Sequence, residues 1–294
     1  MTRRKLAFVL AGGGARGALQ AGALRALHEA GCRPDLVCGT SIGALNAGIL
    51  AVNGFTPDAL AALDSAWRDA ARANLLPRGY LGPTVRAFLG RNNSHLQDSI
   101  RAFLTEHGVK PELTFGALTG VPTRIVAADV RGGQTVVYGA NPKEYLLEAV
   151  LASSAIPLWV EPLETNGRRL LDGGAVSNLP IEPAMAAGAT EIIALDLADP
   201  RPPPGLRAIS NQAFQLLYTM HRRQAELETA LAAARGVTVH KVTLRCAEHP
   251  VALWDFPYAP QLMDEGHALM QEELARWERA RSWHERLRFR RRPI

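Results

Sequence analysis

The sequence predicts an α/β protein: a three-layer α/β/α sandwich built around a mainly parallel central sheet. Short apolar runs alternate with longer amphipathic segments along most of the chain, which is typical of this class. The first two runs, residues 5–10 and 36–38, flank a predicted helix over residues 18–30. A strand, a crossover helix and a second strand in so short a stretch form the βαβ unit of a parallel sheet. At 294 residues, the chain can bury a large core.

Further elements follow from hydrophobic periodicity and from turn residues. Thr56 and Pro57 are typical of a helix start, and Arg131-Gly132-Gly133-Gln134 indicates a hairpin between two strands. Helices are predicted over residues 42–52, 57–73, 94–107, 143–154, 181–187, 206–235 and 260–281, and strands over residues 123–129, 135–138, 168–171, 191–197 and 237–244. The proline-rich residues 200–205 mark the edge of the main body. We therefore expect a catalytic domain over residues 5–198 and a C-terminal helical extension over residues 199–294 that packs on the same body.

Composition limits the class of protein. Apolar residues make up 47% and charged residues 21% of the chain, as in ordinary globular proteins. No apolar stretch approaches the roughly 20 residues of a membrane span, and the apolar run 6–11 is short for a signal peptide. The three cysteines, Cys32, Cys38 and Cys246, form no C-x-x-C pair, so we expect no disulfide framework and no zinc site. These features favour a cytoplasmic protein, with peripheral membrane contact as an additional possibility.

Two segments suggest contact with lipid. Residues 74–93 combine chain-breaking glycines and prolines with exposed-looking hydrophobic residues, as in a lid, although a plain connector fits equally well. The basic tail, residues 286–294, accounts for much of the net charge of +5. Such a tail can lie on an anionic membrane, or it can be a solvated terminus. No nucleic-acid-binding fold signature accompanies it, so nucleic acid is not an expected partner.

The strongest local signal is Gly39-Thr40-Ser41-Ile42-Gly43, between a predicted strand and a predicted helix. A G-x-S-x-G sequence at this junction is typical of a nucleophile elbow. A serine on so sharp a turn exposes its hydroxyl, and glycines two residues away leave room for close approach of helix and strand. The helix N-terminus also favours negative charge near the serine oxygen. The same residues alone also fit a glycine-rich turn with an N-capping serine.

A second glycine-rich loop, Gly12-Gly13-Gly14-Ala15-Arg16-Gly17, follows the first strand. In a parallel sheet it lies beside the elbow, and the N–H groups of Gly12, Gly13 and Gly14 are placed to stabilise an oxyanion. The loop also matches the G-x-G-x-x-G dinucleotide motif. That motif expects an acidic residue at the end of the second strand, where Gly39-Thr40-Ser41 stands instead. The dinucleotide interpretation is therefore disfavoured.

The base that would activate Ser41 is less obvious. None of the eight histidines falls in an expected strand-end loop beside a catalytic neighbour, so a Ser-His-Asp triad has no favoured histidine. Asp172 follows an apolar strand and precedes Gly173 and Gly174, which places it on a tight turn. A carboxylate there can accept the serine proton directly. Alone, the pattern equally fits an aspartate that bonds to its own backbone.

Together, the glycine loop, the elbow and Asp172-Gly173-Gly174 resemble the three-block signature of the patatin-like phospholipases. Two further stretches, Ala152 to Pro157 and Asn178-Leu179-Pro180, agree with it, and the likeness covers about residues 5–198. The resemblance implies a patatin-like fold with no metal and no cofactor. It also implies a nucleophile, Ser41, a base, Asp172, an oxyanion hole at Gly12, Gly13 and Gly14, and supporting roles for Arg16, Gly17, Gly39, Gly43, Gly173 and Gly174.

The activity implied by the resemblance is hydrolysis of carboxylic ester bonds in phospholipids or related lipids. Arg16 either contacts a phosphate or anchors its loop, and the sequence leaves both open. A thioesterase or general carboxylesterase with the same dyad is one alternative, and a non-catalytic lipid-binding regulator is another. A lipid ester is the expected partner. The sequence predicts neither the head-group and acyl-chain preference nor the oligomeric state.

Overall fold

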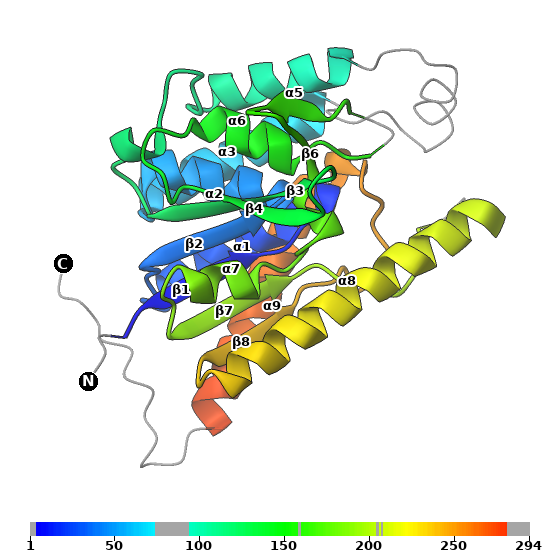
Figure 1. Ribbon diagram of the computed structural model, residues 1–294. Coiled ribbons are helices and arrows are strands. Elements are labelled where there is room, and N and C mark those ends of the chain that lie inside the picture. Colours follow the sequence, from blue (N-terminus) through cyan, green and yellow to red (C-terminus); the bar gives the residue numbers. More distant parts are fainter. Residues whose placement is uncertain (1–3, 74–93, 158–159, 204–205, 207, 281–294) are drawn as a thin grey trace.

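The computed structural model describes residues 4–73, 94–157, 160–203, 206 and 208–280 (Figure 1). The predictions of a lid at residues 74–93 and of a membrane-binding tail at residues 286–294 lie outside the described residues. Among the described helices, none combines the length and the apolar character that crossing a bilayer requires.

An eight-stranded sheet forms the centre of the molecule, in the order β5-β6-β3-β2-β1-β7-β8, with β4 paired to β3. The strands are β1 (Leu6–Leu10), β2 (Leu36–Thr40), β3 (Thr123–Asp129), β4 (Gln134–Tyr138), β5 (Leu163–Thr165), β6 (Arg168–Asp172), β7 (Glu191–Asp196) and β8 (Thr238–Thr243). The run from β3 to β8 is parallel, whereas β4, β5 and β6 pair antiparallel. Every residue of β1, β2 and β7 is buried, because helices cover both faces of the parallel part.

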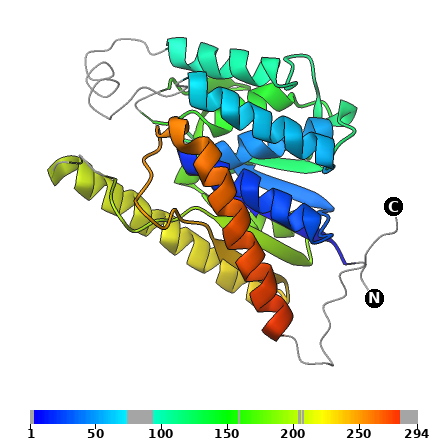
Figure 2. The same cartoon turned by 180° about the vertical axis from the view of Figure 1, so that it is seen from behind.

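Helices on both faces complete the three predicted layers (Figures 1 and 2). The described helices are α1 (Gly17–Glu29), α2 (Ile42–Asn53), α3 (Pro57–Ala73), α5 (Ser94–Glu106), α6 (Leu146–Ser153), α7 (Ile181–Ala186), α8 (Ala208–Ala234) and α9 (Ala259–Ala280). α7 and α8 lie on one face, and α1 and α9 lie together on the other. This arrangement confirms the predicted α/β/α sandwich with a mainly parallel sheet.

The described part of the predicted C-terminal extension is built into the main body. β8 pairs in parallel with β7, so this segment supplies the last strand of the sheet. α9 packs along α1 at two glycines: a Cβ at Gly22 would lie 1.8 Å from the Met263 carbonyl oxygen, and one at Gly266 would lie 2.0 Å from that of Leu19. Only residues without a side chain allow two helix backbones to approach so closely.

Candidate active site

Ser41 occupies a sharp turn between β2 and α2, as the G-x-S-x-G sequence predicts. Its backbone has φ 55° and ψ −122°, a left-handed conformation that is costly for a residue with a side chain. The flanking glycines allow the turn to close. A Cβ on Gly39 would lie 2.3 Å from the Gly43 carbonyl oxygen, and one on Gly43 would lie 2.2 Å from that of Leu10. The elbow is therefore strained at the serine and tightly packed on both sides of it.

The Ser41 hydroxyl meets the carboxylate of Asp172, which stands at the end of β6. Ser41 Oγ donates to Asp172 Oδ2 over 2.5 Å, and the other carboxylate oxygen accepts the N–H of Gly174 at 2.8 Å. Asp172 lies opposite Ala127 in the antiparallel pairing of β6 with β3, and only 8% of its surface is exposed. The structure thus brings together two residues that lie 131 positions apart in the sequence.

Burial makes this carboxylate more basic. Loss of solvation raises the pKa of Asp172 from 3.8 to about 6, and the hydrogen bonds from Ser41 and Gly174 oppose that rise. The group is therefore ionised at neutral pH but more basic than an ordinary aspartate. A general base is most effective when its pKa lies near the working pH.

A second serine, Ser153, is hydrogen-bonded to the backbone of the elbow. Ser153, at the end of α6, is fully buried; its Oγ accepts the Ser41 N–H at 2.8 Å and donates to the Val126 carbonyl at 2.6 Å. This hydrogen bond uses the first free N–H of α2, which would otherwise need a cap. Sequence analysis placed Ser153 in a stretch resembling the family but gave it no role, because no local pattern indicates a contact across 112 residues.

The glycine loop lies beside the elbow, as a parallel sheet predicts. A Cβ on Gly12 would approach Ser41 Cβ to 3.1 Å. The N–H of Gly12 already donates to the Asn178 carbonyl at 3.0 Å, whereas the described residues supply no acceptor for the N–H groups of Gly13 and Gly14. Gly14 adopts a left-handed φ of 58°, and Ala15 bonds to the Leu253 carbonyl. Of the three glycine N–H groups, only that of Gly12 therefore has an acceptor among the described residues.

Other motif residues have mainly packing roles in the structure. Arg16 Nε donates to the Gly13 carbonyl at 3.1 Å, which anchors the glycine loop. A Cβ on Gly17 would lie 2.5 Å from Ile42 Cγ1, so this glycine lets α1 pack against α2. A Cβ on Gly173 would lie 2.2 Å from the Val126 carbonyl oxygen, so this glycine keeps the aspartate turn close to β3.

One histidine approaches the site, although no histidine was favoured by the sequence. His221 lies on α8, and its Nε2 is 3.4 Å from the position of a Cβ on Gly174. Burial, together with the smaller effect of the positive charge of Arg16, lowers the pKa of His221 to about 4. The ring is therefore neutral at neutral pH. No local sequence pattern predicts this contact, because it depends on how α8 packs against the loop that follows Asp172.

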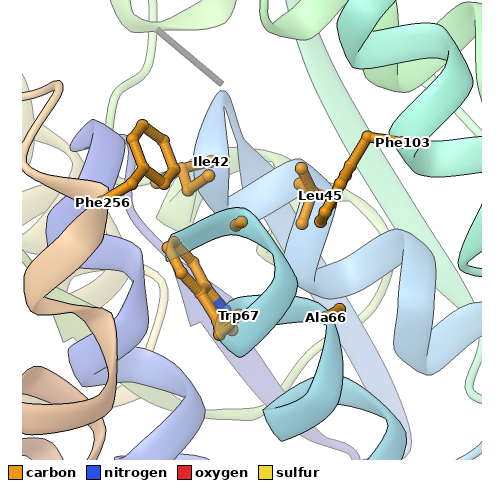
Figure 3. A pocket seen from close by; sticks show the side chains of 7 residues that line it. Ile42, Leu45, Ala66, Trp67, Phe103 and Phe256 are labelled. Atoms are coloured by element: carbon orange, nitrogen blue, oxygen red, sulfur yellow. The ribbon is translucent and has the colours of Figure 1, made fainter. Parts of the chain in front are cut away.

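A small apolar recess adjoins the elbow (Figure 3). It is lined by residues from α2, α3, α5 and the turn before α9, namely Ile42, Leu45, Ala66, Trp67, Ala70, Phe103 and Phe256. Trp67 is fixed in this wall because its indole N–H donates to Asn46 Oδ1 at 2.9 Å. The recess holds only about 10 Å³, which is room for about one water molecule.

A comparison with known families shows which family the chain belongs to. The sequence profile of the patatin-like phospholipase family matches residues 8–185, which is more than half of the chain. The chain belongs to the patatin-like phospholipase family. The matched range contains the glycine loop, the elbow and Asp172, so the resemblance seen in the sequence is confirmed.

Individual relatives cover the chain only in part. An uncharacterised NTE family protein of Mycobacterium tuberculosis is 28% identical over 223 residues, which is 76% of this chain and 57% of that protein. Lysophospholipase NTE1 of Mycosarcoma maydis is 28% identical over 202 residues, which is 65% of this chain and 10% of that protein. This chain thus spans little more than half of the first relative and a small part of the second.

A solved structure supports the fold. The crystal structure of VipD from Legionella pneumophila superposes with a TM-score of 0.52 and 14% sequence identity, and the match covers 93% of this chain and 67% of that one. Because the match covers 93% of this chain, the similarity in fold reaches beyond residues 8–185, which the family profile matches.

Proposed function

We propose that this protein is a lipid acyl hydrolase in which Ser41 is the nucleophile and Asp172 is its general base. The observation that carries the proposal is the 2.5 Å hydrogen bond from Ser41 Oγ to Asp172 Oδ2, at a strained elbow beside a glycine loop. A serine hydroxyl is a weak nucleophile unless a neighbouring base takes its proton. Membership of a phospholipase family supports a lipid ester as substrate.

In the proposed reaction, Ser41 Oγ attacks the ester carbonyl carbon while Asp172 accepts the hydroxyl proton. The negative charge on the carbonyl oxygen is stabilised by the N–H groups of Gly13 and Gly14, and the positive end of α1 contributes. The intermediate collapses, the C–O bond breaks, and the leaving alcohol takes the proton from Asp172. Water then attacks the acyl-serine ester with Asp172 again as base, which releases the fatty acid and restores Ser41.

The apolar recess beside Ile42 is the natural place for the start of an acyl chain, because its wall consists of hydrocarbon side chains. At about 10 Å³ it does not hold a chain as it stands. We therefore propose that Phe103 or Phe256, at its rim in Figure 3, changes rotamer when a lipid binds. The wall beneath is more rigid, because the hydrogen bond from Trp67 to Asn46 fixes the indole.

Labelling with a fluorophosphonate probe, followed by mass spectrometry, tests the dyad without a guess about substrate. We expect the probe to modify Ser41 in the wild type and to leave Ser41→Ala unlabelled. In Asp172→Asn the labelling rate should fall by at least about a hundredfold, the usual contribution of general-base catalysis. Asp129→Asn is the matched control, because Asp129 is also 8% exposed but bonds to the β3–β4 turn and to β6. It should label at the wild-type rate.

Two results would contradict the proposal. Unchanged labelling of Asp172→Asn would show that another group is the base, with His221 the nearest candidate. A folded wild-type protein that resists the probe would favour the alternative of a lipid-binding regulator without turnover. If Ser41 reacts as expected, rates with phospholipid, acylglycerol and acyl-thioester substrates separate a lipid hydrolase from a thioesterase or general carboxylesterase.

A further inference from the structure

The longest helix of the described structure, α8, packs on the body only along part of its length. At 1.5 Å per residue its 27 residues extend about 40 Å. Its buried residues, Ala225 and Ala232, lie in the second half, which packs against α7 and β8. Figure 1 shows the first half extending away from the sheet and from α7. We call residues 208–220 the α8 tip.

The α8 tip exposes more large apolar side chains than any other described segment. Eight large hydrophobic residues are exposed in the described structure, and four of them lie in the tip: Ile209 (83% exposed), Leu216 (63%), Leu217 (44%) and Met220 (44%). Their spacing of i, i+7, i+8 and i+11 places them on one face of the helix. Leu227 (53% exposed) continues the same face about two turns further on. A contiguous exposed apolar surface of this kind is typical of a site that contacts a membrane or another protein.

Charge along α8 changes abruptly at the end of the tip. Residues 208–220 contain no Asp, Glu, Lys or Arg, and the exposed side next to the apolar stripe carries Gln212, Gln215 and Thr219. Arg222 and Arg223 follow after His221, both exposed and both paired with Glu226. An uncharged apolar tip followed by two arginines matches the depth profile of a lipid interface, where hydrocarbon gives way to anionic headgroups.

The next turns of the same helix border the candidate active site. His221 approaches Gly174, which donates a hydrogen bond to Asp172. Gln224 Nε2 donates to the Ala175 carbonyl at 2.9 Å, and Glu228 accepts the hydroxyl of Ser177 at 2.6 Å. A surface that holds the α8 tip would therefore lie close to the loop that carries the proposed base.

We propose that the α8 tip is a membrane-interface helix: its apolar face enters the outer layer of a bilayer, and Arg222 and Arg223 contact anionic headgroups. Membrane contact would present the Ser41–Asp172 site to lipid esters, so its role in catalysis rests on the proposed function. The stripe also has the spacing of a helix-pairing seam, which would suit a second copy of the chain. Seams of that kind are flanked by charged residues that set the pairing, and the tip has none, so the bilayer is the better fit.

Flotation with vesicles made of equal parts phosphatidylcholine and phosphatidylglycerol tests this contact on the full chain. Leu216→Ser combined with Met220→Ser should weaken binding at least about tenfold, because two apolar side chains no longer leave water. Gln212→Ser combined with Gln215→Ser is the matched control: it changes helix propensity by a similar amount but leaves the apolar stripe intact. The control should bind within about twofold of the wild type, and vesicles of phosphatidylcholine alone should bind every form more weakly.

Equal vesicle binding by the Leu216/Met220 variant and the wild type would overturn the proposal. A wild-type dimer that the same variant converts to a monomer, with vesicle binding unchanged, would assign the stripe to a second copy instead; analytical ultracentrifugation reports this, and circular dichroism checks that α8 is folded. Flotation of Ser41→Ala keeps the two proposals separate. Vesicle binding needs no turnover, so it is expected even if the proposed dyad is wrong. Labelling of Ser41 in the wild type is expected even if the α8 tip does not bind membranes.

Discussion

The two members of the candidate dyad are held in place by different kinds of structure. Ser41 lies within one continuous stretch, the strand β2, the turn and the helix α2, so neighbouring residues fix its geometry. Asp172 ends β6, a strand that pairs antiparallel with β3 and reaches the site only through that pairing. The position of the nucleophile is therefore determined locally, whereas the position of the base depends on the order and register of the sheet.

The elbow around Ser41 and the turn after Asp172 also differ in how much space they leave for an added side chain. At the elbow, the space a Cβ would need on Gly43 is occupied by the backbone of β1, which has no freedom to move. At the aspartate turn, a Cβ on Gly174 would meet only side-chain atoms, of Asp172, Asn178 and His221, at 3.1 to 3.4 Å. Neither glycine has a positive φ, so steric space alone distinguishes them.

The largest expected effect in this comparison comes from Gly43→Ala. Its Cβ would lie 2.2 Å from the Leu10 carbonyl oxygen, so α2 must move away from the sheet, at a cost of about 3 kcal/mol or more. Gly174→Ala should cost about 1 kcal/mol, because three side chains can adjust by a few tenths of an ångström. Urea unfolding measures both values. Similar losses for the two variants would contradict the idea that the elbow is the stiffer region.

This difference also explains which parts of the site the sequence predicted. The elbow, the glycine loop and the β3–β4 hairpin have local signatures, and the structure places all three as expected. The pattern around Asp172 fits a catalytic base and an ordinary turn aspartate equally well, and only the resemblance to a family favours the base. Hydrogen bonds from Ser153 and the approach of His221 were not predicted, because each depends on contacts between distant segments. β5 was missed because it has only three residues, none of them buried.

The Gly12 N–H shows the same limit on a smaller scale. The sequence predicted three glycine N–H groups for the oxyanion, since all three residues lack a side chain. The structure gives the first of these groups to the Asn178 carbonyl, which comes from the loop after β6. Only the packing of that loop against the glycine loop reveals which N–H groups have a partner.

A second, smaller effect is expected from removing the charge of the base. Folding raises the pKa of Asp172 from 3.8 to about 6, so the native state holds the proton more tightly and ionisation destabilises it. Asp172→Asn should therefore gain up to about 3 kcal/mol of stability at pH 8, and the gain should shrink as pH falls through 6 toward 4. Urea unfolding of the variant and the wild type at pH 8 and at pH 4 measures this difference in stability.

Asp129→Asn supplies a control of opposite sign for this pH dependence. Burial acts to raise the pKa of Asp129, but backbone hydrogen bonds from Gly132 and Arg131 outweigh burial and lower it. The ionised carboxylate then stabilises the fold above pH 4, and that contribution is lost as pH falls. Asp129→Asn should lose stability at pH 8. If Asp172→Asn gains the same stability at pH 8 and at pH 4, folding does not raise the pKa of Asp172.

A smaller effect than that of Gly43→Ala concerns the hydrogen bond between the elbow and Ser153 of α6. Ser153→Ala removes the acceptor of the Ser41 N–H, at a residue with a strained φ, and also the hydroxyl donor to the Val126 carbonyl. The loss should be about 1–2 kcal/mol, with slower labelling of Ser41 because the elbow relaxes. Ser154→Ala is the matched control, because its Oγ reaches the Ser41 carbonyl only at 3.5 Å and is half-buried. If both variants label at the wild-type rate, the glycines alone hold the elbow, and the site depends on local structure even more than the comparison suggests.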